Sequence, residues 1–511
     1  MVNSVDLGGR PFHFIGVGGI GMSALASILA RRGFPVSGSD LYLNHITHRL
    51  QAEGVHIFLG QEAENFNYYL SAIELEPALS SAVGATITAP TNSPSLWQEQ
   101  ATLDRRLPQV ICSTAIPSAN PEYRMALELG CPIFHRSDLL AALMQDYRSI
   151  AVAGTHGKTT TSSMIGYLLL QAGLDPTIVV GGEVAAWKGN ARLGQSPYLV
   201  AEADESDGSL VKLVAEIGII TNIELDHPDH YSTLEQVVDT FTTFAQQCTI
   251  LVGCIDCPIV LQLNPTITYS LEPVSNADYT VTEPTYRATG TSALVWERGT
   301  CLGKLNLSLL GRHNLSNALA AVAVGRSLGL DFAEIAPILS TFQGARRRFE
   351  HRGEYNRILF IDDYAHHPSE IQATLSAAHL QVGTADRQFD RLIAVFQPHR
   401  YSRTQTFLSE FAQSFADADV VVTTDIYAAG EQNSIGLTGE QVAEAIALHH
   451  PQVVYQPTLS DITTYLKDTL IPGDLVLFLG AGNLNRVIPD LTTYYQQGYS
   501  PTDRVGQATE S

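Results

Sequence analysis

The chain has 511 residues, a length that predicts about three domains rather than a single hydrophobic core. Hydrophobic residues make up 45% and charged residues 16%, as in a globular protein, and the formal net charge of −22 argues against nucleic acid or an anionic membrane as a partner. No apolar run reaches the roughly 18 residues of a membrane span, and no signal peptide opens the chain, so we expect a cytoplasmic protein without a membrane partner.

The first segment begins with an apolar strand that runs into a glycine-rich turn. The strand covers residues 11–15, the turn has the pattern Gly-x-Gly-x-x-Gly, and a helical run leads to a second strand over residues 35–40. This order is the βαβ fingerprint of dinucleotide binding, in which an acid about twenty residues after the glycines contacts a ribose. The pattern alone does not separate a nicotinamide cofactor from another ribonucleotide diphosphate. Its candidate residues are Gly16, Gly18, Gly19, Ile20, Gly21 and Asp40.

Between about residues 68 and 108 the chain is rich in Ala, Ser, Thr and Pro and lacks clear periodicity. We predict a surface insertion without chemistry there, since clusters of these residues are typical of loops. Order resumes with an apolar run from Gln109, which leads into the turn residues Ser113, Thr114, Ala115 and Ile116.

The second segment opens with an apolar strand that leads directly into Gly154-Thr155-His156-Gly157-Lys158-Thr159-Thr160. Such a turn presents backbone N–H groups and a helix N-terminus to a polyphosphate, adds the Lys158 charge and places the Thr159 hydroxyl on Mg²⁺. The general P-loop has four residues between its glycines, whereas this loop has two, which indicates a subtype of ATP-binding protein. The sequence therefore predicts an ATP site.

Acidic residues follow the next two predicted strands, at the edge where a parallel sheet collects its ligands. Glu202 ends the strand that starts at residue 198, and it is the best candidate for the oxygen ligand that Mg²⁺ requires. Its close competitors are Asp204, Glu205 and Asp207. His227, after the second strand, is either a structural hydrogen-bonding residue or a ligand of a second metal. Two Mg²⁺ ions would help an anionic carboxylate to approach an anionic γ-phosphate.

The later part of the chain predicts an antiparallel stretch over residues 267–310, a turn into a helix that carries Asn314 and Asn317, and a third α/β unit. The strands of this unit are predicted at 357–361, 392–396, 419–424 and 474–479. Histidines and arginines follow two of these strands, in residues 362–368 and 397–403, and arginine suits bidentate recognition of a carboxylate or phosphate.

Together these patterns predict an α/β protein of three domains, over residues 1–147, 148–343 and 344–499, with a disordered polar tail over 500–511. Nine motifs in this order resemble the Mur ligases, three-domain ATP-dependent amide ligases of peptidoglycan precursor synthesis. Besides the glycine turn and the P-loop they are Ala201–Asp207, Thr221–His227, Gly311–Asn314, Arg347–Glu350, Asp362–Pro368, Phe396–Tyr401 and Asp425–Glu431. The similarity covers nearly the whole chain apart from the insertion and the tail, and is greatest to the alanine-adding branch.

The resemblance implies a Rossmann-like UDP-binding domain, a central P-loop ATPase domain with a parallel sheet, and a C-terminal Rossmann-like domain. It also implies that ATP phosphorylates the lactyl carboxylate of UDP-N-acetylmuramate and that the amine of L-alanine attacks the acyl phosphate, giving the amide, ADP and phosphate. The small-molecule partners would be these substrates, with Mg²⁺ (two ions) as cofactor, and we expect a monomer or a weak homodimer.

Individual roles follow from the same resemblance. ATP would contact Gly154, Thr155, His156, Gly157, Lys158, Thr159, Thr160, Asn314, Asn317 and Arg347. The metal ligands would be Thr159, Glu202 and His227. The amino acid and the carboxylate would be oriented by Tyr364, His366, His367, Arg400 and Arg403, with His366 as the candidate for the base. The UDP-sugar would contact the glycine turn, Asp40 and residues Ser113 to Ile116.

Three alternatives remain at this stage. A recycling ligase that joins UDP-N-acetylmuramate to a tripeptide shares the first domain and the P-loop. A NAD-dependent oxidoreductase would explain the glycine turn but not the P-loop, and a non-catalytic nucleotide-binding regulator would not need Lys158, Glu202 and His227. Sibling ligases that add later residues use a modified lysine about fifteen residues beyond the metal histidine, whereas residues 228–247 contain no lysine here.

Overall fold

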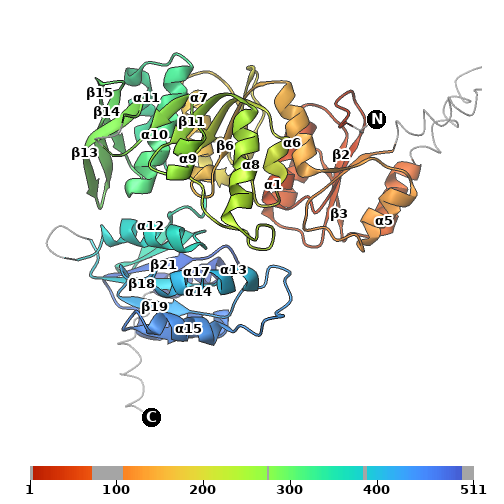
Figure 1. The fold of residues 1–511 in the computed structure, drawn as a ribbon. Helices are drawn as coiled ribbons and strands as arrows, with labels where there is room; N and C mark the ends of the chain where they lie inside the picture. Colours follow the sequence, from red (N-terminus) through yellow and green to blue (C-terminus); the bar gives the residue numbers. More distant parts are fainter. Residues whose placement is uncertain (1–3, 72–106, 273–275, 384–387, 498–511) are drawn as a thin grey trace, which may run out of the picture. The chain divides into compact units, whose positions relative to one another are not determined.

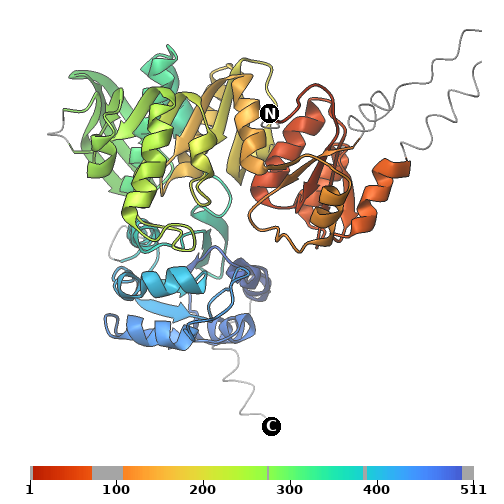
Figure 2. The ribbon, with the colours of Figure 1, turned by 45° about the vertical axis from the view of Figure 1, so that its right-hand side comes forward.

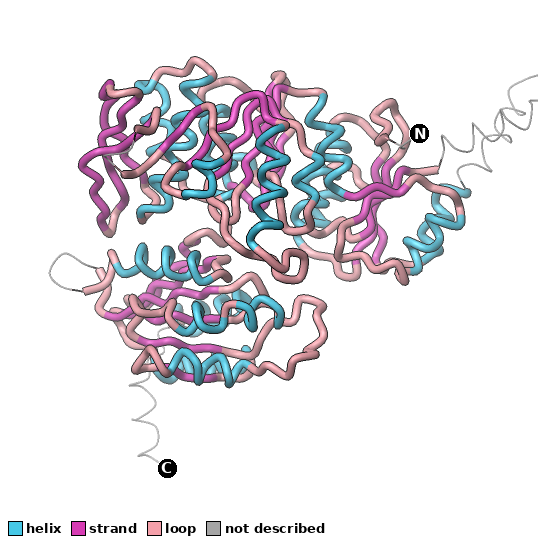
Figure 3. The backbone as a smooth tube through the Cα atoms, viewed as in Figure 1, coloured by secondary structure: helices cyan, strands magenta, loops and turns pink. Residues whose placement is uncertain are grey.

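The computed structural model describes residues 4–71, 107–272, 276–383 and 388–497. They form three sheets flanked by helices, which confirms the predicted α/β class (Figures 1 and 3). The chain divides into two compact units, one of residues 1–151, 174–203 and 209–216, the other of residues 152–173, 204–208 and 217–511. Most of the predicted insertion, 72–106, and the predicted tail lie outside the described residues. At the edges of the insertion the prediction is wrong, because Tyr69 and Leu107 are buried in the core of the first sheet.

The first sheet has five parallel strands in the order β3-β2-β1-β4-β5. Its strands are β1 (Phe12–Ile15), β2 (Val36–Asp40), β3 (His56–Leu59), β4 (Gln109–Cys112) and β5 (Ile133–His135). Its helices are α1 (Ile20–Arg31), α2 (His45–Ala52), α5 (Pro121–Glu128) and α6 (Arg136–Gln145), with a 3-10 turn over Ala63–Phe66. Strand order reverses beside β1, so the glycine turn after β1 lies at the switch point where open α/β sheets bind ligands.

The second sheet has ten strands in the order β15-β14-β13-β12-β11-β10-β6-β9-β7-β8. The strands are β6 (Arg148–Ala153), β7 (Thr177–Val184), β8 (Gly189–Arg192), β9 (Tyr198–Glu202), β10 (Ala215–Ile220), β11 (Cys248–Cys254), β12 (Ile267–Tyr269), β13 (Tyr279–Arg287), β14 (Gly290–Glu297) and β15 (Thr300–Leu307). The antiparallel prediction is confirmed for β13, β14 and β15 but wrong for β12, which pairs in parallel with both of its neighbours.

The helices of this segment are α7 (Lys158–Gln171), α8 (Leu234–Gln246), α9 (Pro258–Gln262), α10 (Arg312–Ser327) and α11 (Phe332–Ser340), with 3-10 turns over Ala185–Trp187 and Ser209–Lys212. Helices α7 and α10 are in contact, and both are lined with buried residues along much of their length. Gly325 of α10 lets the two helices approach closely, because a Cβ on it would lie 2.9 Å from Cδ2 of Leu168 in α7. This packing brings residues 158–161 and 314–317 close together.

The third sheet has the order β16-β17-β21-β18-β19-β20, with β16 as an antiparallel edge strand. Its elements are β16 (Glu350–Tyr355), β17 (Ile358–Asp363), α12 (Pro368–His379), β18 (Arg391–Phe396), α13 (Tyr401–Thr406), α14 (Leu408–Ala412), β19 (Val420–Thr423), α15 (Gly439–Ala447), β20 (Val453–Tyr455), α16 (Leu459–Thr469), β21 (Asp474–Leu479), a 3-10 turn (Leu484–Arg486) and α17 (Val487–Gln496). The predicted strand 474–479 is confirmed residue for residue.

Helices cover both faces of this sheet (Figures 1 and 2). The residues of β17 pack against both faces. Leu359 and Ile361 pack into one buried cluster, while Ile358 and Phe360 pack into the other. Successive residues of a strand point to opposite faces, so a strand buried on both sides needs a continuous apolar run. The polar loops after β17 and β18 are thereby held at one edge of the sheet. Among the described residues, no helix is long and apolar enough to cross a membrane.

Candidate active site at the P-loop

The P-loop joins β6 to α7 through two glycines that have backbone angles unfavourable for other residues. Gly154 has φ = 134°, and a Cβ on it would collide with the hydroxyl of Thr221. Gly157 has φ = 82°, and its Cβ would lie 2.7 Å from Oδ1 of Asn317. The short loop therefore needs glycine at both ends, since only glycine adopts these angles without strain and leaves room for the neighbouring side chains.

Residues after β10 form hydrogen bonds to the P-loop. The amide of Thr155 donates to the carbonyl of Asn222 at 2.9 Å, and the amide of His156 donates to its side-chain oxygen at 2.8 Å. The hydroxyl of Thr221 donates to the carbonyl of His156 at 2.6 Å. Two loop amides are thus engaged within the protein. The first N–H groups of α7, which have no acceptor within the helix, are the part of the turn that suits an anion.

Lys158, the first residue of α7, is oriented by three acceptors. Its Nζ donates to the carbonyls of Gly154 at 2.7 Å and Thr155 at 3.0 Å, and to Oε1 of Glu205 at 2.9 Å. Burial raises the pKa of Glu205 to about 7, although the Lys158 charge acts in the opposite direction. The other oxygen of Glu205 is buried without a hydrogen-bond partner. A buried carboxylate oxygen of this kind beside a P-loop fits a divalent cation, which prefers hard oxygen ligands.

His227 lies beside two buried carboxylates, those of Asp226 and Glu205. It has φ = 55°, and its Nε2 is 3.5 Å from Asp226 and 3.9 Å from Glu205. Burial lowers the pKa of His227 to about 4 despite the neighbouring carboxylate of Asp226. The ring is therefore neutral at pH 7, which is the form that binds a metal.

Arg403 from α13 contacts both Asp226 and His227. The sequence predicted this arginine as a substrate-binding residue and did not predict these contacts. Its Nε donates to Asp226 at 2.8 Å, and both side chains are almost fully buried. Its other nitrogens lie 3.2 Å from His399 and 3.3 Å from His227. The guanidinium thus links the loop after β18 to the loop after β10, and Arg403 has a structural task whatever else it binds.

Glu202, the predicted magnesium ligand, ends β9 in the first compact unit. It accepts a hydrogen bond from the amide of Gly181 at 2.6 Å, and a Cβ on that glycine would lie 2.6 Å from both carboxylate oxygens. The glycine in β7 thus makes room for the carboxylate. The position of Glu202 as a ligand stays a prediction.

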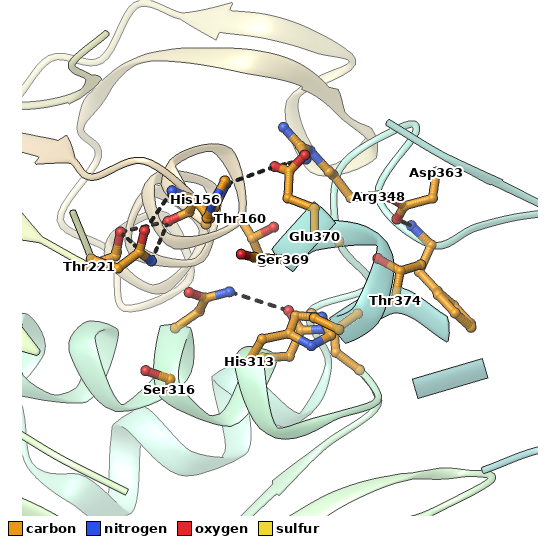
Figure 4. A pocket seen from close by; sticks show the side chains of 18 residues that line it. His156, Thr160, Thr221, His313, Ser316, Arg348, Asp363, Ser369, Glu370 and Thr374 are labelled. Atoms are coloured by element: carbon orange, nitrogen blue, oxygen red, sulfur yellow. Dashed lines mark hydrogen bonds and ion pairs between the residues drawn. The ribbon is translucent and has the colours of Figure 1, made fainter. Parts of the chain in front are cut away.

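A cavity of about 160 Å³ lies beside the P-loop, among α7, α10 and α12 (Figure 4). It is lined by residues from five of the predicted motifs and by further residues next to them. They include His156, Gly157, Thr160, Asn222, His313, Asn314, Asn317, Arg348, Asp363, Ser369 and Glu370. Two asparagine side chains link the start of α7 to the cavity wall. Thr161 donates to Oδ1 of Asn317 at 3.1 Å, and the amide nitrogen of Asn314 lies 3.1 Å from His313. The cavity therefore joins a phosphate-binding turn to a wall rich in hydrogen-bonding groups.

Asn314 and Asn317, predicted near the adenine and ribose, both line this cavity. Arg347 is not among its lining residues; the neighbouring Arg348 is. Instead, Arg347 donates to the carbonyl of Gly480 at 2.6 Å, and its guanidinium lies over the ring of Tyr364 at 4.9 Å. Sequence reasoning also missed His313, although it is part of the Gly311–Asn314 motif.

The predicted amino-acid residues gather in the loops after β17 and β18. Nδ1 of His366 lies 2.9 Å from the carbonyl of Tyr364 and 3.2 Å from Glu370. His367 is buried and caps α12, where its Nδ1 accepts from the amide of Ser369. Arg400, with φ = 67°, pairs with Asp229 at 2.5 Å.

His156 of the P-loop lies between two carboxylates. Glu224 and Glu370 are each 3.4 Å from one of its ring nitrogens, at the long end for hydrogen bonds but within ion-pair range. Burial alone would lower the pKa of His156, but the two carboxylates outweigh it and raise the pKa to about 10. With His367, His156 and Glu224 also form a group whose potential ligand atoms lie within 4.8 Å of one another.

In the first unit, Asp40 braces the glycine turn. Its Oδ2 accepts from the amide of Gly18 at 2.9 Å, and a Cβ on Gly18 would lie 2.7 Å from that oxygen. Ile116 reaches the same turn, since its side chain would contact a Cβ on Gly16 at 3.4 Å. Asp40 and Ile116 thus lie beside the glycine turn, and their contact with a UDP-sugar stays a prediction.

Comparison with known proteins finds matches along most of the chain. Three family models match, described as the Mur ligase family catalytic domain (residues 11–148), the Mur ligase middle domain (152–325) and the Mur ligase glutamate ligase domain (347–482). A UDP-N-acetylmuramate–L-alanine ligase of Nostoc punctiforme is 65% identical over 498 residues, covering 97% of this chain and 98% of the relative.

Two solved structures have the same fold. A UDP-N-acetylmuramate–alanine ligase of Thermotoga maritima aligns with a TM-score of 0.76 and 27% identity, covering 96% of this chain and 100% of its own. A murein peptide ligase of Psychrobacter arcticus aligns with a TM-score of 0.65 and 23% identity, covering 96% of this chain and 99% of its own. From the three matched regions and the end-to-end relative, this chain belongs to the Mur ligase family.

Proposed function

We propose that this protein is an ATP-dependent ligase that joins L-alanine to the lactyl carboxylate of UDP-N-acetylmuramate during peptidoglycan precursor synthesis, and so contributes to cell shape and division. The observation that carries the proposal is its end-to-end similarity to L-alanine ligases, at 65% identity, together with an intact P-loop. A carboxylate resists attack by an amine, so it must first gain a leaving group. Transfer of the γ-phosphoryl group of ATP supplies one, and ADP departs.

The ATP phosphates are bound by the N-terminus of α7 and by Lys158 in this proposal, with residues 154–160 around them. The cavity beside the loop takes the nucleoside, where Asn314, Asn317 and His313 offer hydrogen bonds to a base. Arg347 remains a predicted contact, and Arg348 joins it because it lines the cavity.

Two Mg²⁺ ions complete the proposed site. Thr159, Glu202 and His227 are the proposed ligands, and the buried free oxygen of Glu205 suits the same region. Bound magnesium would neutralise charge between the carboxylate and the γ-phosphate. The protein groups do the rest: Lys158 draws negative charge to the turn, and His227 is kept neutral by burial.

The UDP-sugar lies at the switch point of the first sheet in this proposal, against Gly16 to Gly21, Asp40 and residues Ser113 to Ile116. L-alanine is oriented by the loops of the third segment, through Tyr364, His366, His367, Arg400 and Arg403. Its amine attacks the acyl phosphate carbon, loses a proton to a base, for which His366 is the candidate, and phosphate leaves as the amide forms.

The domain boundaries 1–147, 148–343 and 344–499 belong to the same proposal, as do a cytoplasmic location and a monomer or weak homodimer. The tripeptide-recycling alternative is not favoured. The murein peptide ligase of Psychrobacter arcticus is 23% identical to this chain, which shows a shared fold. The L-alanine ligase of Nostoc punctiforme is 65% identical. The oxidoreductase alternative leaves the P-loop without a role.

The test is phosphate release from purified protein with Mg²⁺-ATP, UDP-N-acetylmuramate and L-alanine, omitting each in turn. We expect release only with all three, and a product heavier by one alanine residue. Release that ignores alanine and proceeds with tripeptide would replace the proposal by the recycling activity.

A further inference from the structure

Glu370, in the first turn of α12, contacts several parts of the proposed site. No sequence motif predicted these contacts. Oε1 is 3.4 Å from Nδ1 of His156 and 3.8 Å from Arg348, and Figure 4 shows the carboxylate between these two side chains. Oε2 is 3.2 Å from Nδ1 of His366 and accepts the amide of His366 at 3.1 Å. One partly buried carboxylate therefore touches the P-loop, the cavity wall and the loop proposed to orient alanine.

The two oxygens have different partners, so neither histidine can shift without disturbing the contact of the other. Burial would raise the pKa of Glu370, but His366 and His156 hold it well below its usual range. The carboxylate is also in the first turn of a helix, where the macrodipole favours a negative charge. Glu370 thus stays ionised and holds two loops in fixed relation.

A second contact fixes the same helix turn to the same loop. Ser369 donates to Glu224 at 2.7 Å, and Glu224 lies 3.4 Å from Nε2 of His156. The imidazole is therefore held from both sides, by Glu370 and by Glu224, and Ser369 of α12 holds Glu224 in turn. Two independent contacts make the arrangement specific for this position of α12 against the P-loop.

A metal held by His156, Glu224 and His367 is the competing explanation of this cluster. Metal binding needs a neutral imidazole. His156 already bridges two carboxylates, and Glu370, which makes one of these contacts, is outside the metal group. The ion-pair arrangement accounts for Glu370 together with His156 and Glu224, whereas a metal would leave Glu370 out.

We propose that Glu370 is a positioning residue that couples the nucleotide site to the amino-acid site by holding His156 and His366 together. The amino-acid half of this inference rests on the proposed function; the nucleotide half does not. A side chain of this kind acts through the residues it orients, so its loss should weaken both ligands at once.

The test uses Glu370→Gln, which keeps the shape and removes the charge. Its matched control is Glu354→Gln, which removes the same charge from an exposed position of β16. Titration calorimetry with a non-hydrolysable ATP analogue gives the nucleotide affinity, and steady-state kinetics give the KM for L-alanine and kcat. We expect Glu370→Gln to raise the Kd of the analogue and the KM for alanine by about tenfold each, while Glu354→Gln changes neither.

A double-mutant cycle with His156→Gln identifies the route of the effect. If Glu370 acts on the nucleotide through His156, the Kd of the analogue for the double variant is no higher than the higher of the two single-variant Kd values. Additive losses, or an unchanged Kd in folded Glu370→Gln, would overturn the inference. If Glu370→Gln does not fold by circular dichroism, Glu370→Asp, which keeps the charge but shortens its reach, takes its place. Wild-type turnover that ignores alanine would refute the proposed function, and the analogue titration would still judge Glu370.

Discussion

Replacing Asp226 by asparagine should destabilise this protein strongly, although the asparagine side chain has nearly the same shape as the aspartate it replaces. The carboxylate is 5% exposed and its partner Arg403 is 2% exposed, with 2.8 Å between Oδ1 and Nε. Removing one partner of a buried ion pair leaves the other charge unpaired, which costs about 3–5 kcal/mol. Arg403 keeps His399 and His227 nearby, and burial lowers the pKa of both rings, so they are neutral and cannot replace the lost negative charge.

We take the lower limit of that range, about 3 kcal/mol, because the two neutral rings still accept hydrogen bonds. For a cooperative unit of 150–250 residues this loss corresponds to a fall in Tm of about 6–12 °C. The assay is differential scanning calorimetry at pH 7. The pKa of Asp226 is lowered in the folded protein, so the stabilisation is complete above the unfolded pKa of about 4 and is lost as the pH falls through the lowered value.

Two further variants make the test specific. Asp229→Asn removes a charge from the partly exposed pair with Arg400 and should change the Tm little, since such pairs contribute about 1 kcal/mol or less. Asp226→Asn combined with Arg403→Met removes both buried charges and should recover most of the loss. The reasoning is refuted if Asp226→Asn melts with the wild type, or if the double variant is no more stable than the single one.

Three other predictions concern the P-loop. Lys158→Ala should lower phosphate release by at least about 100-fold with the fold intact, because a charge at the phosphates is lost; Lys212→Ala, on the surface, is the control, and near-normal turnover of Lys158→Ala would contradict the ATP site. Gly154→Ala should unfold or strongly destabilise the protein, because φ = 134° strains alanine and the new methyl collides with a threonine hydroxyl; thermal melting checks this, and an unchanged Tm would contradict it. The raised pKa of His156, about 10, means that its ion pairs stabilise fully below its unfolded pKa of about 6.5 and are lost as the pH rises towards 10. The Tm difference between wild type and His156→Gln should therefore shrink from pH 6 to pH 10, and a constant difference would show that these ion pairs do not titrate.

Sequence patterns predicted the parts of this fold that depend on local rules. Strand β21 was found with its correct limits because a strand buried on both faces is a continuous apolar run. The edge strand β16 was missed because its residues are mostly polar and none is fully buried, with His351 and Glu354 exposed. Its pairing with β17 depends on a neighbour that the sequence pattern does not reveal.

The site follows the same division. Lys158 and the two P-loop glycines were predicted because their geometry is fixed by adjacent residues. The contact between His156 and Glu370 joins positions 214 apart in sequence, since 370 − 156 = 214, and exists only after α12 packs beside the P-loop. Choosing Arg348 rather than Arg347 as a cavity residue was likewise beyond the sequence, because both follow one another in a single loop whose backbone decides which side chain points inward.

The left-handed backbone at three predicted site residues has a consequence for laboratory evolution. His227, Arg347 and Arg400 have φ values of 55°, 57° and 67°, a conformation that glycine adopts without strain. Glycine there would relieve backbone strain but would lose the side-chain contacts that the histidine and the two arginines make. A library selected for heat resistance alone should therefore accumulate glycine at these positions and lose turnover, so a selection for robust variants has to include activity in every round.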